Sequence, residues 1–106
     1  MRKVTSPAVR VTEAALREQL MREGLQPTRW DNGPHAVYEL HDHPYGKILV
    51  VVSGSITFTL TKGQRVVPMR QGDRLVLPPS TPHSAIVGPH GVVCLEAHIP
   101  ASSPNA

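Results

Sequence analysis

Aromatic residues and cysteine are scarce in this chain of 106 residues, which holds one Phe, one Trp, two Tyr and one Cys. Hydrophobic residues still make up 40% of the sequence, so Val, Leu and Ile must fill the core of a single domain of this length. The lone Cys94 excludes an internal disulfide and favours a reducing compartment, so we expect a cytoplasmic protein. Eleven Pro and eight Gly favour a turn-rich β protein over a helical bundle.

The sequence also lacks long hydrophobic runs and clusters of basic residues. The longest apolar run, residues 48–52, is too short to span a bilayer, and the charged N-terminus has no apolar signal core. The net charge is +3, but the Lys and Arg residues are scattered and form no run interleaved with aromatic residues. We therefore expect neither a membrane nor a nucleic acid as a partner.

Residues 12–24 (TEAALREQLMREG) predict a short amphipathic helix. Thr12 is a suitable N-cap, and Gly24 suits the C-terminal stop. Leu16 and Leu20 lie four residues apart on one stripe, and charged residues fill the other face. So narrow a stripe favours a helix that packs on its own domain, with a partner-binding helix as the alternative.

After Pro27 the apolar residues follow the two-residue period of β-strands. Residues 47–53 (KILVVVS) are apolar on both faces, as in a strand that is buried on both sides. Residues 55–61 alternate Ile, Phe and Leu with hydroxyl residues, and turns are expected at Gly54 and at residues 88–91. About seven short strands separated by such turns predict an all-β sandwich or small barrel.

Two histidines, His41 and His43, stand one residue apart in the stretch HDHPYGK. Alternate residues of a strand point to the same side, so both imidazoles can be directed at one point. His83 follows the turn-forming stretch LPPSTP at the start of another strand. Inward positions of distant strands face each other across a closed barrel, so the three imidazoles could bind one metal ion. The alternative is two surface histidines and an unrelated third.

Two stretches carry a resemblance to a known family. Residues 41–54 (HDHPYGKILVVVSG) resemble the first conserved motif of the cupins, which is H-x-H followed at a set spacing by a carboxylate and a glycine. Residues 72–83 (GDRLVLPPSTPH) resemble the second motif. The matching residues are His41, His43, Gly54, Gly72, Pro78 and His83. The resemblance implies a small single-domain cupin: an all-β, antiparallel double-stranded β-helix, or jelly-roll-like barrel, which in this chain carries a short N-terminal helix.

By this resemblance, His41 and His43 are metal ligands from one strand and His83 is the third. Cupin metals include iron, manganese, nickel, zinc and copper, and imidazole accepts most of them, so the divalent metal is not distinguished. Lys47 stands where the motif has a carboxylate ligand, and a protonated amine has no lone pair to donate. Three neutral ligands leave the metal charge in place, so the site should attract an anionic ligand. Lys47 would lie beside that ligand, or else reach the barrel mouth or pair with an inward-facing Glu.

Glu39 and Lys47 are the candidate pocket residues. Glu39 has the same parity as His41 and His43, so it should face the interior, where it would neutralise Lys47 or orient a histidine. The opposite parity puts three residues on the outer face: Ala36, Tyr38 and Leu40.

The last strand carries further polar residues, Glu96 and His98, on one face. For these two we expect an ion pair or hydrogen bond near the open end of the barrel, with metal ligation as the alternative. Cys94 should be a small core residue. His35 and His90 lie beside Gly-Pro turns and should be loop residues.

Three segments are expected along the chain: an N-terminal arm and helix (1–34), the cupin barrel (35–99) and a tail (100–106). The tail has nothing to bury and should be disordered. Small cupins are commonly dimers, so the resemblance implies a homodimer, and we expect residues before His35 to help form its interface.

The resemblance leaves the function open between two main classes. One is a metal-dependent oxygenase, isomerase or decarboxylase that acts on a small organic molecule; similar three-histidine families include dioxygenases of thiol and of flavonol-like substrates. The other is a non-catalytic module that binds a small molecule or a metal. A barrel that has lost its metal is a third reading, because Lys47 replaces the usual carboxylate.

Overall fold

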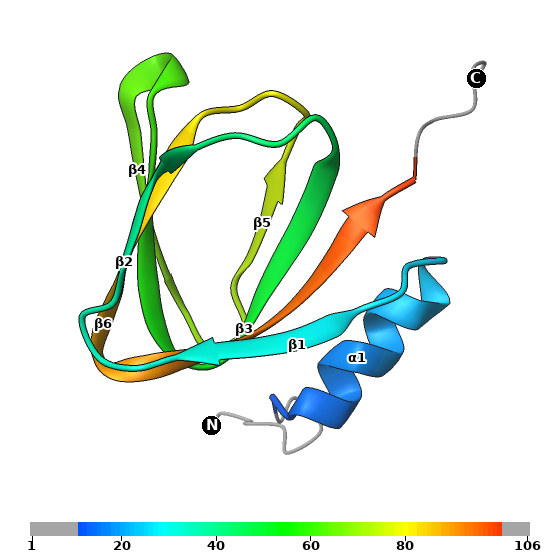
Figure 1. The fold of residues 1–106 in the computed structure, drawn as a ribbon. Coiled ribbons are helices and arrows are strands. Elements are labelled where there is room, and N and C mark those ends of the chain that lie inside the picture. Colours follow the sequence, from blue (N-terminus) through cyan, green and yellow to red (C-terminus); the bar gives the residue numbers. More distant parts are fainter. Residues whose placement is uncertain (1–10, 101–106) are drawn as a thin grey trace, which may run out of the picture.

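A computed structural model describes residues 11–100, which form one α-helix, one short 3-10 turn and six strands (Figure 1). The elements in chain order are α1 (Glu13–Arg22), β1 (Thr28–Asn32), β2 (Val37–His41), β3 (Gly46–Leu60), η2 (Lys62–Gln64), β4 (Arg65–Arg70), β5 (Arg74–Leu77) and β6 (His83–Ile99). Most of the predicted tail and the first ten residues of the predicted arm lie outside the described residues. Among the residues that are described, no helix is both long and apolar enough to cross a membrane.

Strands β3 and β6 pair with each other along nearly their whole length, from Gly46 opposite Ile99 to Leu60 opposite His83. β1 and β2 pair with β6, while β4 and β5 pair with β3, and every pairing is antiparallel. Figure 1 shows how these strands curl around a common interior. The expected all-β antiparallel fold with one short N-terminal helix is confirmed.

The turns predicted at Gly54 and at residues 88–91 are instead bends inside β3 and β6. Gly54 and Gly91 have φ values of 76° and 78°, and the ladder between the two strands shifts register beside Gly54. A Cβ atom on Gly54 would overlap the carbonyl oxygen of Gly91, so the two backbones meet where no side chain fits. The prediction was wrong because glycine marks a positive φ whether a strand ends there or only bends.

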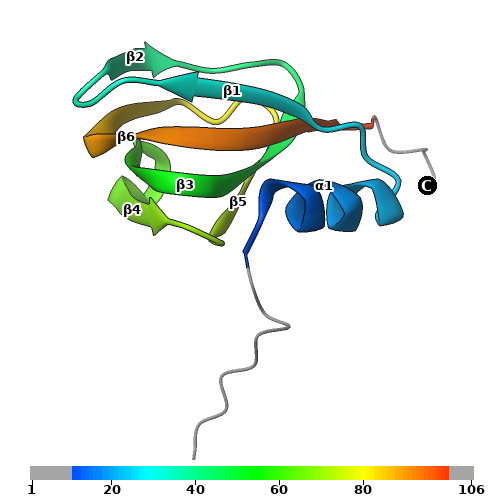
Figure 2. The ribbon, with the colours of Figure 1, turned by 90° about the horizontal axis from the view of Figure 1, so that it is seen from below.

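The predicted helix is confirmed, and it packs on the outside of the barrel (Figure 2). The Thr12 side chain accepts a hydrogen bond from the Ala15 N–H at 3.1 Å, which caps the first turn. Leu20 is fully buried against the outer face of β3 and β6, with Leu16 beside it. Glu13 forms ion pairs with Arg17 and with Arg29 of β1, at 3.0 and 3.2 Å.

The first half of β3 is buried on both sides, as expected. Leu49 and Val51 belong to the core inside the barrel, whereas Ile48 and Val50 pack under α1. Beyond the Gly54 bend only the residues of the inner face are buried, namely Ile56, Phe58 and Leu60. These alternating positions confirm the predicted two-residue period, and their side chains form an apolar surface inside the barrel.

Strand β1 was not anticipated. It pairs with β6, with Trp30 opposite Cys94, so the sheet includes part of the segment expected to be an arm. Its sequence TRWDN has a single apolar residue, which is too few to show a strand period. The strand closes one side of the interior and brings Trp30 to it.

Strand β2 contains an irregularity that changes which residues face inward. Tyr38 lies opposite Ala85 and His41 opposite His83, so three steps along β2 correspond to two along β6. Such a bulge puts Tyr38 and His41 on the same face although they are an odd number of residues apart. Ala36 and Tyr38 consequently pack against the interior core, which corrects the outward placement predicted for them. Leu40 is exposed, as predicted.

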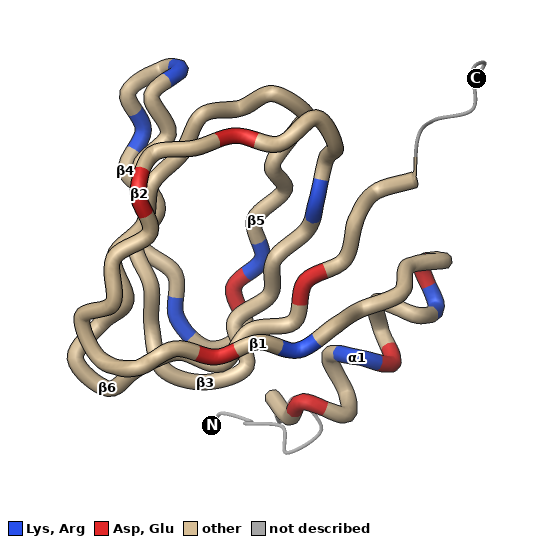
Figure 3. Tube along the Cα trace, in the orientation of Figure 1, with Lys and Arg blue, Asp and Glu red and all other residues tan. Residues whose placement is uncertain are grey.

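The charged residues of the described part of the chain are spread over many elements (Figure 3). Acidic and basic residues lie side by side on α1 and β1, where they form the ion pairs described above.

Candidate metal centre

His41, His43 and His83 lie together at one end of the barrel interior. His41 ends β2 and His83 begins β6 directly opposite it, while His43 follows in the connection to β3. One ring nitrogen from each of the three lies within 4.8 Å of the others. The centroid of the His41 ring is 4.8 Å from that of His43 and 4.4 Å from that of His83.

Backbone carbonyls hold two of these rings by their Nδ1 atoms. His41 Nδ1 contacts the Glu39 carbonyl oxygen, and His83 Nδ1 lies 2.8 Å from the Thr81 carbonyl oxygen. A carbonyl can only accept, so Nδ1 carries the proton and donates it in each case. The Nε2 atoms of both rings are therefore left with a free lone pair, as a metal ligand requires.

His43 is held by two different neighbours. The Tyr45 hydroxyl lies 3.3 Å from its Nδ1, and the two rings stack with centroids 5.0 Å apart. On the other side of the ring, Lys47 Nζ donates to Nε2 over 3.5 Å. Nε2 therefore also has its lone pair directed into the interior, at present towards an ammonium group.

This donor set fits a divalent metal. Three nitrogens that bind one ion tetrahedrally at about 2.1 Å lie about 3.4 Å apart, so a spacing of 4.8 Å would have to close by about 1.4 Å. Burial lowers the pKa of His43, with the Lys47 ammonium as a second cause, and burial also lowers the pKa of His83. Both rings are thus neutral near pH 7, which is the state that coordinates metal.

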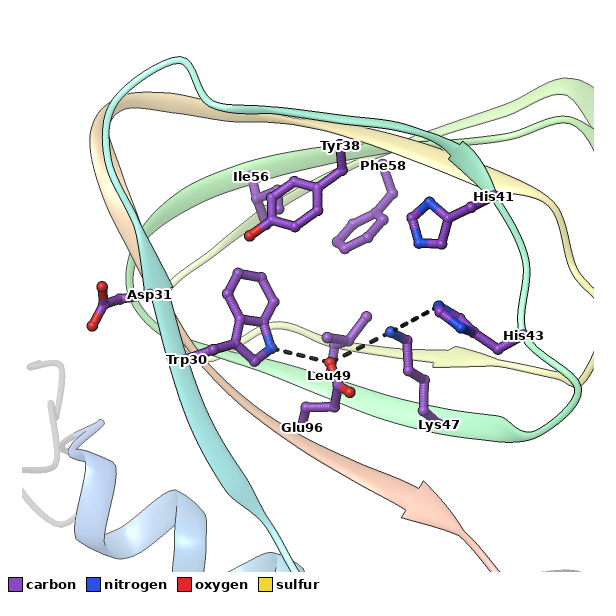
Figure 4. A pocket seen from close by; sticks show the side chains of 10 residues that line it. All are labelled: Trp30, Asp31, Tyr38, His41, His43, Lys47, Leu49, Ile56, Phe58 and Glu96. Carbon is purple, nitrogen blue, oxygen red and sulfur yellow. Dashed lines mark hydrogen bonds and ion pairs between the residues drawn. The ribbon is translucent and has the colours of Figure 1, made fainter.

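Lys47, which replaces the expected carboxylate ligand, is 9% exposed and points into the interior. Its Nζ lies 3.4 Å from Glu96 Oε1, and the same oxygen accepts the Trp30 indole N–H at 3.0 Å (Figure 4). This geometry matches the expected pairing of Lys47 with an inward-facing Glu. Glu96 thus has an ion pair, as expected, but its partner is Lys47, whereas His98 stacks on Tyr45. Among the described residues, Glu96 does not belong to the group that could hold a metal.

Glu39 does not lie where its parity predicted. Its side chain is exposed and does not line the cavity, because the bulge in β2 turns residue 39 outward before His41 turns inward. It contributes only its carbonyl oxygen, which orients the His41 ring. A bulge leaves no mark in the apolar period, so parity alone could not reveal it.

The cavity next to the histidines has a volume of about 370 Å³, within the range of small-molecule sites. Its lining residues are Trp30, Asp31, Tyr38, His41, His43, Lys47, Leu49, Ile56, Phe58 and Glu96. Figure 4 shows His41, His43 and Lys47 at one end and Trp30 and Tyr38 at the other.

Three aromatic residues at the site were missed or misplaced from the sequence. Trp30 lies on the unexpected β1, and Tyr38 was assigned to the outer face. Tyr45 lies within the motif stretch itself. Its position two residues after His43 could have indicated that its side chain lies beside the His43 ring.

The remaining Cys and His residues lie apart from the three histidines. Cys94 is fully buried in the core, as expected, and burial raises the pKa of its thiol to about 12. His98 is exposed and stacks on Tyr45, with centroids 3.9 Å apart. His35 and His90 are exposed. Within the described residues, none of these four joins the group that could hold a metal.

A family model of the cupin domain matches residues 29–95, which is more than half of the chain. The chain therefore belongs to the cupin family. Among curated proteins, none matches the chain in sequence.

Several solved structures superpose on this one. A chain from the crystal structures of the DMSP lyases RdDddP and RnDddQII aligns with a TM-score of 0.66 and 23% identity, over 77% of this chain but only 42% of that one. An RmlC-like cupin from Shewanella frigidimarina aligns with a TM-score of 0.62 and 21% identity, over 77% and 71% of the two chains. The polyketide cyclase RemF from Streptomyces resistomycificus aligns with a TM-score of 0.60 and 21% identity, over 70% and 54%. These likenesses show a shared fold, the double-stranded β-helix expected from the sequence.

Proposed function

We propose that this cupin binds one divalent metal ion through His41, His43 and His83 and uses it on a small organic molecule in the adjacent cavity. The observation that carries the proposal is the approach of three ring nitrogens within 4.8 Å, two of the rings being fixed by Nδ1 contacts to backbone carbonyls. Imidazole is the commonest protein ligand for such metals.

The favoured activity is that of a metal-dependent oxygenase, isomerase or decarboxylase. When bound, the metal supplies Lewis acidity or oxygen chemistry to the substrate. The residues of the chain position the substrate. Trp30, Tyr38 and Phe58 form an apolar wall of the cavity, and the buried side chains of Leu49 and Ile56 exclude water from its inner end. Proteins named as a DMSP lyase and a polyketide cyclase share the fold, which supports an enzyme acting on small molecules.

A non-catalytic binding module is the second candidate, and the carboxylates of the cavity favour it. Glu96 is engaged by Lys47 and Trp30, and Asp31 is paired with Arg29 at 2.8 Å. Of the described lining residues, no carboxylate is thus left free to act as a general base. Stabilisation by a metabolite without product formation would identify this class, and turnover would identify the enzyme.

The metal is tested with untagged protein purified without added metal. Mass spectrometry of its metal content should find close to one equivalent per chain, and calorimetry should show tight binding of Zn²⁺ or Co²⁺ to the stripped protein. His83→Ala should weaken this affinity at least about tenfold because it removes one of three ligands. His90→Ala is the matched control on an exposed histidine and should leave the affinity unchanged. Equal affinity in the wild type and His83→Ala would contradict the proposal.

A further inference from the structure

We infer that the cavity binds a small organic carboxylate. Its carboxyl group would lie between Lys47 and the metal site at His43 Nε2, and its apolar part would lie against Trp30 and Tyr38. This inference rests on the proposed function for the metal, and it names the class of substrate or ligand that the same site accepts. Four observations support it: the unused donors of Lys47, the position of His43 Nε2, the charge balance of the interior, and the aromatic wall.

Lys47 has fewer acceptors than its ammonium group can use. The group carries three N–H donors, and a buried cation requires partners for them. Within the described residues its hydrogen-bond partners are Glu96 Oε1 at 3.4 Å and His43 Nε2 at 3.5 Å, both long for charge-assisted bonds. The Glu96 oxygen is also shared with the Trp30 indole. Lys47 therefore has hydrogen-bonding capacity left for a further acceptor in the cavity.

Metal binding increases this unused capacity. His43 Nδ1 faces Tyr45, so Nε2 is the atom that a metal would take, and it is the same atom to which Lys47 donates. A nitrogen lone pair cannot serve both partners. The Lys47 donor is released next to the metal site, where an anionic oxygen would satisfy it. A carboxylate has two oxygens, so one can face the ion while the other accepts from Nζ.

The charges around the site also favour an anionic ligand. Imidazole binds a metal in its neutral form, Lys47 and Glu96 offset each other, and Asp31 is paired with Arg29. A divalent ion held there would keep its full charge in a partly enclosed cavity. One carboxylate removes half of that charge, so a negatively charged ligand is favoured over a neutral one of the same shape.

The rest of the cavity sets the body of the ligand. The Trp30 and Tyr38 rings lie 5.7 Å apart at an angle of 55°, and the Phe58 ring lies between them and the histidines (Figure 4). These surfaces offer dispersion contacts and almost no hydrogen bonds. With a cavity of about 370 Å³, the ligand is a carboxylate whose apolar or aromatic part is close in size to one ring.

Trp30 provides a direct readout of binding because it is the only Trp of the chain and lines the cavity. The test titrates zinc-loaded wild-type protein with benzoate, with its neutral analogue benzamide and with acetate, which lacks the apolar body, and follows indole fluorescence. Benzoate should bind at least about tenfold more tightly than either of the others. Lys47→Met should weaken benzoate at least about tenfold and leave benzamide unchanged, while Lys62→Met, on the exposed η2 turn, should change neither.

A second variant gives the opposite sign and so guards against misfolding of Lys47→Met. Glu96→Gln can still accept from Trp30 but no longer neutralises Lys47, so benzoate should bind more tightly than to the wild type. The inference is overturned if benzoate and benzamide bind equally, if wild-type protein binds neither, or if both variants bind benzoate as the wild type does.

Zinc content is measured separately in every sample, which separates the two proposals. A wild type that holds zinc but does not prefer benzoate retains the proposed function and loses this inference. A wild type that holds no zinc loses the proposed function. In that case the metal-free protein should still prefer benzoate, more weakly and through Lys47, and the absence of that preference overturns the inference as well.

Discussion

Lys47 and Glu96 form an ion pair inside the barrel, with Nζ 3.4 Å from Oε1. They are diagonal neighbours on β3 and β6, because Lys47 lies opposite His98 and Leu49 lies opposite Glu96. A cation, Lys47, thus occupies the motif position where cupins have a carboxylate ligand. The carboxylate that balances its charge, Glu96, lies 49 residues later in the sequence. Both charges are largely buried, so their pairing matters to the fold as well as to the site.

Removing Glu96 should destabilise the metal-free protein. Glu96→Ala leaves the Lys47 ammonium and the Trp30 indole N–H without their shared acceptor, which should cost about 2–3 kcal/mol of the free energy of unfolding. Glu18→Ala breaks an exposed ion pair with Arg22 and should change it by less than about 0.5 kcal/mol. Urea unfolding measures the free energy of unfolding of both variants. Equal losses would show that the buried ion pair stabilises the fold no more than the exposed one.

The bend at Gly54 should tolerate no side chain. Gly54→Ala adds a positive-φ penalty and a clash with the Gly91 backbone, so a loss of more than about 3 kcal/mol, or failure to fold, is expected. Gly63→Ala is the matched control, because Gly63 has the same φ of 76° but lies in the open η2 turn. It should cost only about 1–2 kcal/mol. Thermal melts distinguish the two, and similar melting temperatures would argue against the close approach.

Acid should destabilise the metal-free protein through His43 and His83. Burial lowers the pKa of both in the folded state, whereas the unfolded chain binds protons near pH 6.5. Below pH 6.5 the unfolded state therefore binds more protons than the folded state. The contribution of these two histidines to the free energy of unfolding is present above pH 6.5, and it is lost as the pH falls through their lowered folded pKa values. The urea midpoint should drop between about pH 7 and pH 5. His83→Gln should flatten this dependence and the exposed His90→Gln should preserve it.

Tyr45 should support metal binding without touching the metal. Tyr45→Phe keeps the ring that stacks on His43 but removes the hydroxyl from Nδ1, so the affinity for Zn²⁺ should fall about tenfold. Tyr38→Phe removes a hydroxyl that is bonded to Asn32 and to no histidine, and it should leave the affinity unchanged. Calorimetry on stripped protein compares them. A loss of affinity confined to Tyr38→Phe would reverse the roles of the two tyrosines.

A homodimer remains a prediction from the resemblance, and light scattering after size exclusion tests it. If residues before His35 form the interface, Met21→Glu on the exposed side of α1 should give monomers and Ile86→Glu should not. The opposite result would move the interface to the outer face of β2 and β6, where Val37 lies opposite Ile86 and both are exposed. A wild type that is already monomeric contradicts the prediction.

The parts of the fold that follow a regular period could be predicted from the sequence. The helix was predictable because Thr12 and Gly24 mark its two ends, and the burial of β3 because Leu49 and Val51 alternate with Ile48 and Val50. The approach of the three histidines was predictable because the spacing of the two cupin-like motifs implies that His41, His43 and His83 face one point in the barrel.

The rest depended on contacts between distant segments. β1 forms because β6 offers it an edge, and nothing local in TRWDN indicates this. The bulge before His41 exists because β2 must keep both Tyr38 and His41 facing inward, and it moved Glu39 out and Tyr38 in. Glu96 could be placed on an inward face by parity, but its choice of Lys47 as partner required the pairing of β3 with β6.

β6 pairs with β1, β2 and β3 at once, and it follows all of them in the chain. During translation these three strands therefore emerge from the ribosome before their common partner exists. The apolar run of β3, residues 48–52, lacks its β6 partner through that interval and is the segment most prone to self-association on nascent chains. Production of this protein should accordingly depend on chaperone capacity and on slower synthesis at low temperature.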